Sequence, residues 1–228
     1  MKNTITLCLI AMLFAACASD SEKKSLDKIA EIYDAKTSYT KSFNSSVGTE
    51  TMKSFNVKVS ESAMIDSLAA TVTTANIAML VYEGLTAEEK GNYTIIDVEL
   101  VNAKNDTVAY NYPLDVLKEI SDKSTYFKTF SESIMNKSYS KIDEIKNAQD
   151  IPDPLGETIA KKMAYLEQEY GALQGYKPFG VAEQKNAAGQ TAFQYQGILM
   201  FKDKDIPYLI TADADPNVKG FVGVRFFN

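Results

Sequence analysis

Three segments near the C-terminus decide the fold class of this chain: Phe193-Gln-Tyr-Gln-Gly-Ile-Leu-Met-Phe201, Ile206-Pro-Tyr-Leu-Ile-Thr-Ala212 and Phe221-Val-Gly-Val-Arg-Phe-Phe227. Each is rich in aromatic and aliphatic residues, and polar residues alternate with them, which is typical of strands. Polar turns separate the segments, at 203–205 and at 213–220. We therefore predict a curved antiparallel meander of three or more strands.

Helical patterns precede this meander. Ile159, Met163, Leu166 and Tyr170 recur at steps of three and four residues, which is the spacing of one helix face. Helices followed by long antiparallel strands indicate an α+β fold, in which a sheet wraps around helices. We assign residues 121–228 to this C-terminal module.

Residues 25–120 are expected to form an N-terminal α+β module, again with helices packed on antiparallel strands. Alternation marks its strands, and steps of three and four mark its helices. The predicted elements are a helix at 25–35, a loop at 37–51, a strand at 55–60, a helix at 62–83, a hairpin at 94–112 and a helix from Pro113.

The first sixteen residues read as an export signal. Lys2 precedes an apolar run from Thr4 to Ala16. A helix of that length spans about 20 Å, which is shorter than the ~30 Å hydrocarbon core of a bilayer. A basic start, a short apolar run and small residues at its end are typical of a signal peptide rather than of a permanent span.

The signal ends in Phe14-Ala-Ala-Cys17, which resembles the lipobox of bacterial lipoproteins. The resemblance implies cleavage between Ala16 and Cys17, acylation of Cys17 (for instance with palmitate), and a polar tether over 17–24. Two alternatives stay open. Ala16-Cys17-Ala18 also suits a cut that releases a soluble protein, and the apolar run could remain uncleaved.

Part of the C-terminal half resembles the nuclear-transport-factor-two-like (cystatin-like cone) superfamily. The resemblance rests on Phe127-Lys-Thr-Phe130 leading to Asn136-Lys-Ser-Tyr139, on the Tyr170 to Tyr176 turn and on the closing strand. It implies a pocket between sheet and helices, in which some members transfer protons with an Asp and a Tyr. The residues that could line it here are Tyr170, Tyr195, Tyr208 and Asp213; alternatively, these tyrosines are packed core or rim residues.

Composition excludes several chemistries. The chain has no His and only two Cys, which removes His-based acid–base catalysis and zinc sites built on His or Cys. The net charge of −6 argues against nucleic acid as a partner. Asp213-Ala-Asp-Pro-Asn217 lacks the Gly and the Glu of a calcium loop, because Val218 and Val224 stand there. We therefore expect no metal, no cofactor and no catalytic residues.

The sequence thus predicts a lipid-anchored lipoprotein of the bacterial cell envelope. Its expected role is non-catalytic binding, with the membrane as one partner and an envelope protein or a small apolar ligand as another. The alternatives are an enzyme that uses carboxylate and Tyr acid–base chemistry, and a structural subunit of an envelope complex. A raised-pKa carboxylate facing a Tyr in a solvent-lined cavity would favour the enzyme.

Overall fold

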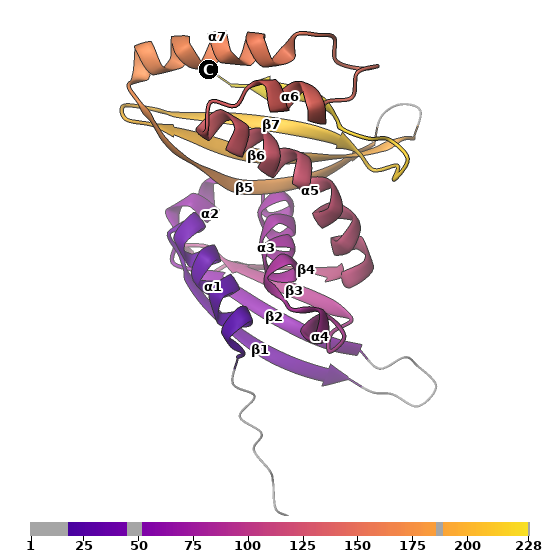
Figure 1. The fold of residues 1–228 in the computed structure, drawn as a ribbon. Coiled ribbons are helices and arrows are strands. Elements are labelled where there is room, and N and C mark those ends of the chain that lie inside the picture. The colour runs from indigo at the N-terminus through magenta and orange to yellow at the C-terminus, as the bar shows by residue number, and fades with distance from the viewer. Residues whose placement is uncertain (1–17, 45–51, 186–188, 228) are drawn as a thin grey trace, which may run out of the picture.

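The computed structural model describes residues 18–44, 52–185 and 189–227; Ala16 and Cys17 lie outside these ranges. Its class is α+β, as predicted, with two four-stranded sheets among the described residues (Figure 1). The first half contains α1 (Asp20–Tyr33), β1 (Lys36–Asn44), β2 (Met52–Ser60), α2 (Ala63–Ser67), α3 (Ala70–Gly84), α4 (Ala87–Lys90), β3 (Ile95–Val101) and β4 (Thr107–Pro113). The second half contains α5 (Leu114–Met135), α6 (Ser140–Ile145), α7 (Leu155–Tyr170), β5 (Leu173–Lys185), β6 (Thr191–Phe201), β7 (Asp205–Asp213) and β8 (Phe221–Phe226).

The first sheet has the order β1-β2-β3-β4 and is mixed rather than purely antiparallel. Its central strands β2 and β3 pair in parallel, with Val57 opposite Val98. The chain between them forms α2, α3 and α4, and a helical crossover of this kind brings the next strand back in the same direction. The predicted hairpin of β3 and β4 is confirmed.

The second sheet is the predicted meander with one strand added, in the order β5-β6-β7-β8, and every neighbouring pair is antiparallel. The alternation along β6 places Phe193, Tyr195, Leu199 and Phe201 on one buried face. Helices α5, α6 and α7 supply the side chains that cover this face, among them Phe130 and Met163. In Figure 1, α7 lies above this sheet, and α3 lies below it next to β5.

The predicted tether at 17–24 and the predicted helix start at Ser25 are wrong. Helix α1 begins at Asp20, because Ser19 and Glu22 form a reciprocal capping box. Ala18 is itself buried, and its N–H donates to the Tyr39 hydroxyl at 2.5 Å. The folded body therefore begins one residue after Cys17.

Two strands were not predicted. The loop expected at 37–51 contains β1, an edge strand whose outward side chains are polar. No strand was predicted over β5: its first residues fall in the turn expected at Tyr170 to Tyr176, and Gly175, Pro178 and Gly180 interrupt its pattern. It pairs with β6 through two register shifts that accommodate these residues, and an edge strand tolerates Pro.

The predicted boundary between modules at residue 120 lies inside α5, which is continuous over 22 residues. Leu117 on this helix packs in the core beside the first sheet, and Phe127 packs in the core beside the second sheet. The helix expected at 62–83 is broken instead, with α2 ending at Ser67 and α3 starting at Ala70. The two sheets are therefore joined by a shared helix.

Candidate functional site

Tyr195 and Tyr208 lie in the packed interior between the second sheet and α5. Each is 1% exposed. Their hydroxyls are 2.5 Å from the Ile120 carbonyl oxygen and from the Ser131 Oγ respectively. The Phe127 ring stacks on the Tyr208 ring at a centroid distance of 5.4 Å. Aromatic rings thus fill the space in which the superfamily resemblance implied a pocket, and the structure supports the packed-core alternative.

Tyr170 lies at the edge of this core, and Asp213 lies at the end of β7. Tyr170 ends α7 and packs edge-on against Phe201, with Lys204 over its ring. Asp213 ends β7, and its Oδ1 accepts the Asp215 N–H at 2.8 Å. Asp215 in turn accepts the Asn217 N–H, so this segment is a chain of Asx turns. The structure does not bring the four predicted pocket residues together at one cavity.

A cleft instead lies between the two halves, where α1, α3, α5 and β5 meet. It has a volume of about 450 Å³, which falls within the range of small-molecule sites. Its apolar lining comes from elements far apart in sequence: Ile32, Met79, Leu80, Phe127, Pro178 and Met200. The junction of two modules is a common place for ligand sites.

Polar side chains surround this apolar lining. Lys28, Lys128 and Lys177 line the cleft together with Glu31 and Glu132. Lys128 pairs at 2.6 Å with Glu83, which also accepts the hydroxyl of the buried Ser124 at 2.9 Å. Three lysines and two carboxylates therefore line the cleft, and Glu83 next to it balances the charge of Lys128. These six side chains together carry no net charge.

Close packing fixes the floor of the cleft. A Cβ on Gly197 would lie 2.7 Å from Phe127 Cζ, so only glycine lets that ring settle against β6. On the β5 side, the register shift at Pro178 sends Phe179 toward the first core and Val181 toward the second.

At the rim of the cleft, burial and the nearby Glu132 carboxylate raise the pKa of Tyr176, so its hydroxyl stays protonated.

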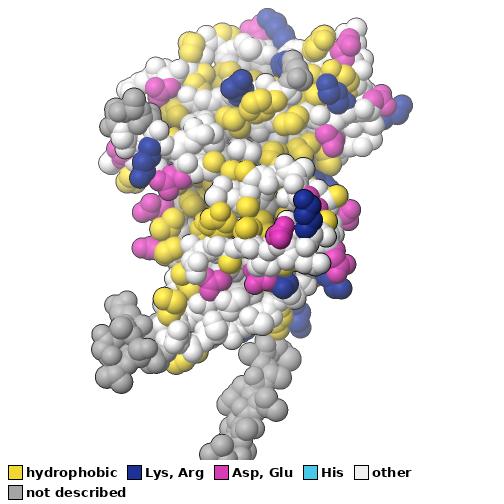
Figure 2. Space-filling view, turned by 180° about the vertical axis from the view of Figure 1, so that it is seen from behind, with side chains coloured by type: hydrophobic (Ala, Val, Ile, Leu, Met, Phe, Trp, Pro, Cys, Tyr) yellow, Lys and Arg dark blue, Asp and Glu magenta, His cyan; other side chains and the backbone are white. Residues whose placement is uncertain are grey.

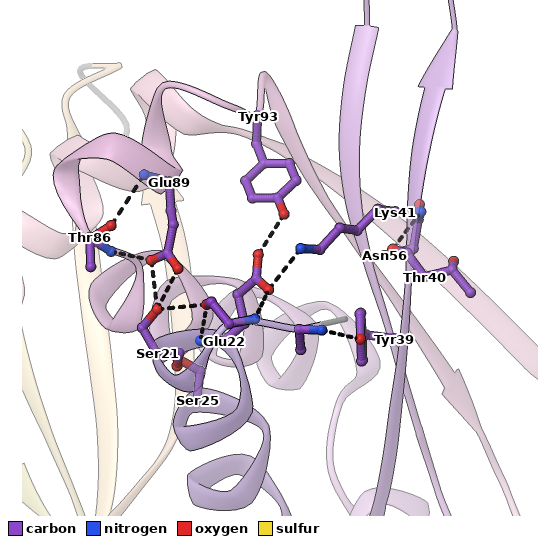
Figure 3. Close-up of polar contacts among 12 residues, drawn as sticks. Ser21, Glu22, Ser25, Tyr39, Thr40, Lys41, Asn56, Thr86, Glu89 and Tyr93 are labelled. Atoms are coloured by element: carbon purple, nitrogen blue, oxygen red, sulfur yellow. Dashed lines mark hydrogen bonds and ion pairs between the residues drawn. The ribbon is translucent and has the colours of Figure 1, made fainter. Parts of the chain in front are cut away.

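A second polar cluster lies at the first turn of α1. Figure 3 shows Glu22 between Lys41 of β1 and Tyr93 of the α4–β3 connection. The carboxylate is 1% exposed, and it lies 2.9 Å from the Lys41 ammonium and 2.6 Å from the Tyr93 hydroxyl. In the same view Glu89 accepts the Ser21 hydroxyl at 2.6 Å, which ties α4 to α1.

The protonation states of this cluster are fixed. Burial alone raises the pKa of Glu22, but hydrogen bonds from Lys41, Tyr93 and the Ser19 N–H outweigh it and hold the pKa below its usual value. Burial and the Glu22 carboxylate raise the pKa of Tyr93. At neutral pH Glu22 therefore stays ionised and Tyr93 stays protonated. Fixed protonation states suit a structural contact better than proton transfer.

The face opposite the view of Figure 1 carries hydrophobic side chains across its middle, where the two halves meet (Figure 2). Val108 and Val116 are among the exposed hydrophobic residues of the structure, and Leu68, Leu100 and Val108 line a cavity beside the β3–β4 hairpin. An apolar area of this kind is typical of contact surfaces.

Sequence reasoning did not identify the cleft. Its lining residues each belong to an ordinary amphipathic stripe or strand, so no local motif distinguishes them. Among the described residues, no group of His, Cys, Asp or Glu is placed to hold a metal ion, and no helix is long and apolar enough to cross a membrane. A scan against protein-family models and searches of curated proteins and of solved structures gave no match.

Proposed function

We propose that the chain is a lipoprotein of the bacterial cell envelope, anchored through Cys17, that binds a small apolar ligand without turning it over. The observation that supports it best is the cleft between α1, α3, α5 and β5, which joins a methionine- and aromatic-lined floor to a rim with balanced charge. Affinity in such a site comes from burial of apolar surface, with the polar rim setting orientation.

The non-catalytic part of the proposal rests on the polar groups. The buried carboxylate that faces a tyrosine, Glu22, has a lowered pKa, whereas a general acid near neutral pH needs a raised one. Next to the cleft, Glu83 is paired with Lys128 and accepts a hydrogen bond from the Ser124 hydroxyl. Both arrangements support a binding role over the carboxylate and Tyr enzyme.

A displacement experiment tests the ligand site. The protein purified from envelopes is titrated with a fluorescent apolar probe, and Met200→Trp is compared with Tyr165→Trp, an exposed position on α7. The larger ring at Met200 fills the cleft, so we expect about tenfold weaker binding, a change of about 1.4 kcal/mol. Equal binding by the two variants would overturn the cleft as the site.

The anchor is tested separately. Cys17→Ser should move the protein out of the membrane fraction, and the mass of the N-terminal peptide of the unsubstituted chain should show acyl chains on Cys17. A peptide without acyl chains would overturn the anchor and leave the cleft untouched.

A second function, a subunit of an envelope complex, is favoured by exposed hydrophobic residues such as Val108 and Val116, which are 41% and 38% exposed. Crosslinking in cells, with a photoreactive residue at Val116 and a control at Tyr165, distinguishes it. A protein captured from Val116 alone supports the complex, and equal capture from both positions contradicts it.

A further inference from the structure

The inference concerns the end of the molecule next to Cys17, and it rests on the proposed anchor. Ala18 is buried and bonded to Tyr39, and Ser19 caps α1. Adjacent Cα atoms are about 3.8 Å apart, so an acylated Cys17 would hold the folded body directly at the bilayer surface. No tether remains to let the body stand away from the lipid.

The pairing of α1 with β1 shows which surface then faces the membrane. The two elements run in opposite directions, because Thr37 bonds Leu26 near the middle of α1 and Lys41 bonds Glu22 near its start. Glu22 belongs to the first turn of α1, and Lys41 lies three residues before the end of β1. The start of α1 and the end of β1 therefore lie at the same end of the molecule, and Phe43 lies there, two residues beyond Lys41.

Phe43 occupies a core-facing position where the helix has ended. Side chains alternate along a strand, so Phe43 shares its face with Tyr39 and Lys41. Tyr39 stacks on Phe55 and Lys41 binds Glu22, but Phe43 extends past the first turn of α1 and is 69% exposed. A large exposed aromatic ring of this kind is typical of a surface that contacts an apolar partner.

Met52 completes an apolar end on the neighbouring strand. It pairs with Asn44 and is 49% exposed, whereas Phe43 pairs with Lys53. Phe43 and Met52 therefore point to opposite faces of the β1–β2 pair, and only an end-on approach brings both into one apolar medium. Figure 1 shows this end of β1 and the start of α1 at the bottom of the molecule, farthest from α7.

We propose that the end of the β1–β2 pair is a membrane-contact element, in which Phe43 and Met52 enter the interface of the same bilayer leaflet that holds the acylated Cys17. The element fixes the orientation of the body, with α7 and the second sheet pointing away from the lipid. Aromatic rings favour this interfacial position, since they are apolar and still compatible with the headgroup region.

Site-directed fluorescence tests the orientation. The acylated full-length protein is reconstituted in phosphatidylcholine vesicles with a bimane label at Phe43→Cys, at Met52→Cys or at Tyr165→Cys. Tyr165 is a matched control, because it is also a large exposed side chain, 52% exposed, but lies on α7. The chain has only two cysteines of its own, Cys8 and Cys17, so labelling is specific once Cys17 is acylated.

We expect lipids with nitroxide headgroups to quench the labels at residues 43 and 52 about twofold or more above the label at residue 165. Equal quenching at all three positions, in protein whose mass confirms the acyl chains, would overturn the contact element and leave the anchor standing. A mass without acyl chains would overturn both, so the two failures are distinguishable.

Discussion

The hydroxyl of Tyr33 donates a 2.8 Å hydrogen bond to the carbonyl oxygen of Phe179, which lies 146 residues further along the chain. The same hydroxyl accepts from Asn76 Nδ2 at 2.7 Å, and both side chains are fully buried. The contact joins α1 and α3 of the first half to the irregular part of β5. It holds together three of the elements that enclose the cleft.

Tyr33→Phe should destabilise the protein by about 1 to 3 kcal/mol. The substitution keeps the ring in its packed place, but it leaves the Phe179 carbonyl and the Asn76 amide buried without this partner. The measurement is the free energy of unfolding in urea. Tyr165→Phe, which removes an exposed hydroxyl, is the control and should change that free energy by less than about 0.5 kcal/mol. Equal effects of the two substitutions would contradict the bonding role of Tyr33.

Stability should fall in acid through the cluster of Figure 3. A carboxyl with a lowered folded-state pKa contributes stability above its usual pKa of 4.5 and loses it as the pH falls through the folded value. Glu22 is such a group. Glu89 is another: slight burial alone raises its pKa, but hydrogen bonds from Ser19, Ser21 and Thr86 outweigh it and lower the pKa to about 2. We therefore expect the urea midpoint to drop between pH 4.5 and about 2.

Glu22→Gln should reduce this fall of the urea midpoint in acid, because the variant has no carboxylate to protonate at that position. The substitution should also lower the free energy of unfolding at pH 7, because the charged contacts with Lys41 and Tyr93 are lost. Urea midpoints measured from pH 2 to pH 7 check both effects. Glu169→Gln, at an exposed position on α7, is the matched control and should follow the unsubstituted protein. An acid limb of unchanged steepness in Glu22→Gln would show that other carboxyls carry the dependence.

Two glycines of the second sheet should respond in opposite ways to alanine. A Cβ at Gly197 would meet Phe127 at 2.7 Å and the Tyr208 ring at 2.8 Å, whereas a Cβ at Gly223 would meet Thr211 at an ordinary 3.5 Å. Gly197→Ala should therefore cost about 1 to 3 kcal/mol through overpacking. Gly223→Ala should be neutral or slightly stabilising. The measurement is the thermal unfolding midpoint of each variant. Similar losses of stability in both variants would contradict the close fit at Gly197.

The helices and strands that could be predicted are those with one buried face and one face exposed to solvent. The meander of β6, β7 and β8 alternates apolar and polar side chains, so its strands and turns were readable from sequence. Strand β1 was not, because its outward positions are all polar and its inward positions include Lys41, whose partner Glu22 lies on α1. A lysine at an inward position breaks the apolar alternation that marks a strand, and its buried position is explained only by its partner Glu22.

Strand β5 and the cleft escaped prediction for a different reason, since both depend on pairing across long stretches of sequence. Pro178 and Gly180 are turn residues in isolation, and only the register shift against β6 keeps them within a strand. The cleft needs Ile32, Phe127 and Met200 to meet, and nothing local in their sequence neighbourhoods indicates that they do. The resemblance implied a pocket at Tyr195 and Tyr208 and left a packed core as the alternative, because alternation along a strand does not distinguish a filled interior from a hollow one. The structure fills that interior with aromatic rings.

The continuity of α5 predicts that the two halves unfold together. Its Leu117 and Phe127 belong to different cores, so the helix transmits order from one core to the other. Glu119 is exposed on the segment between them, and proline there would break the helix at a cost of about 3 kcal/mol while touching neither core. We expect hydrogen exchange of β3 and of β7 to report one shared unfolding free energy in the unsubstituted protein and two different values in Glu119→Pro. Glu119→Ala removes the same side chain but preserves the helix, so it should keep the single value. A single value in Glu119→Pro would show that contacts such as the Tyr33–Phe179 bond couple the halves without the helix.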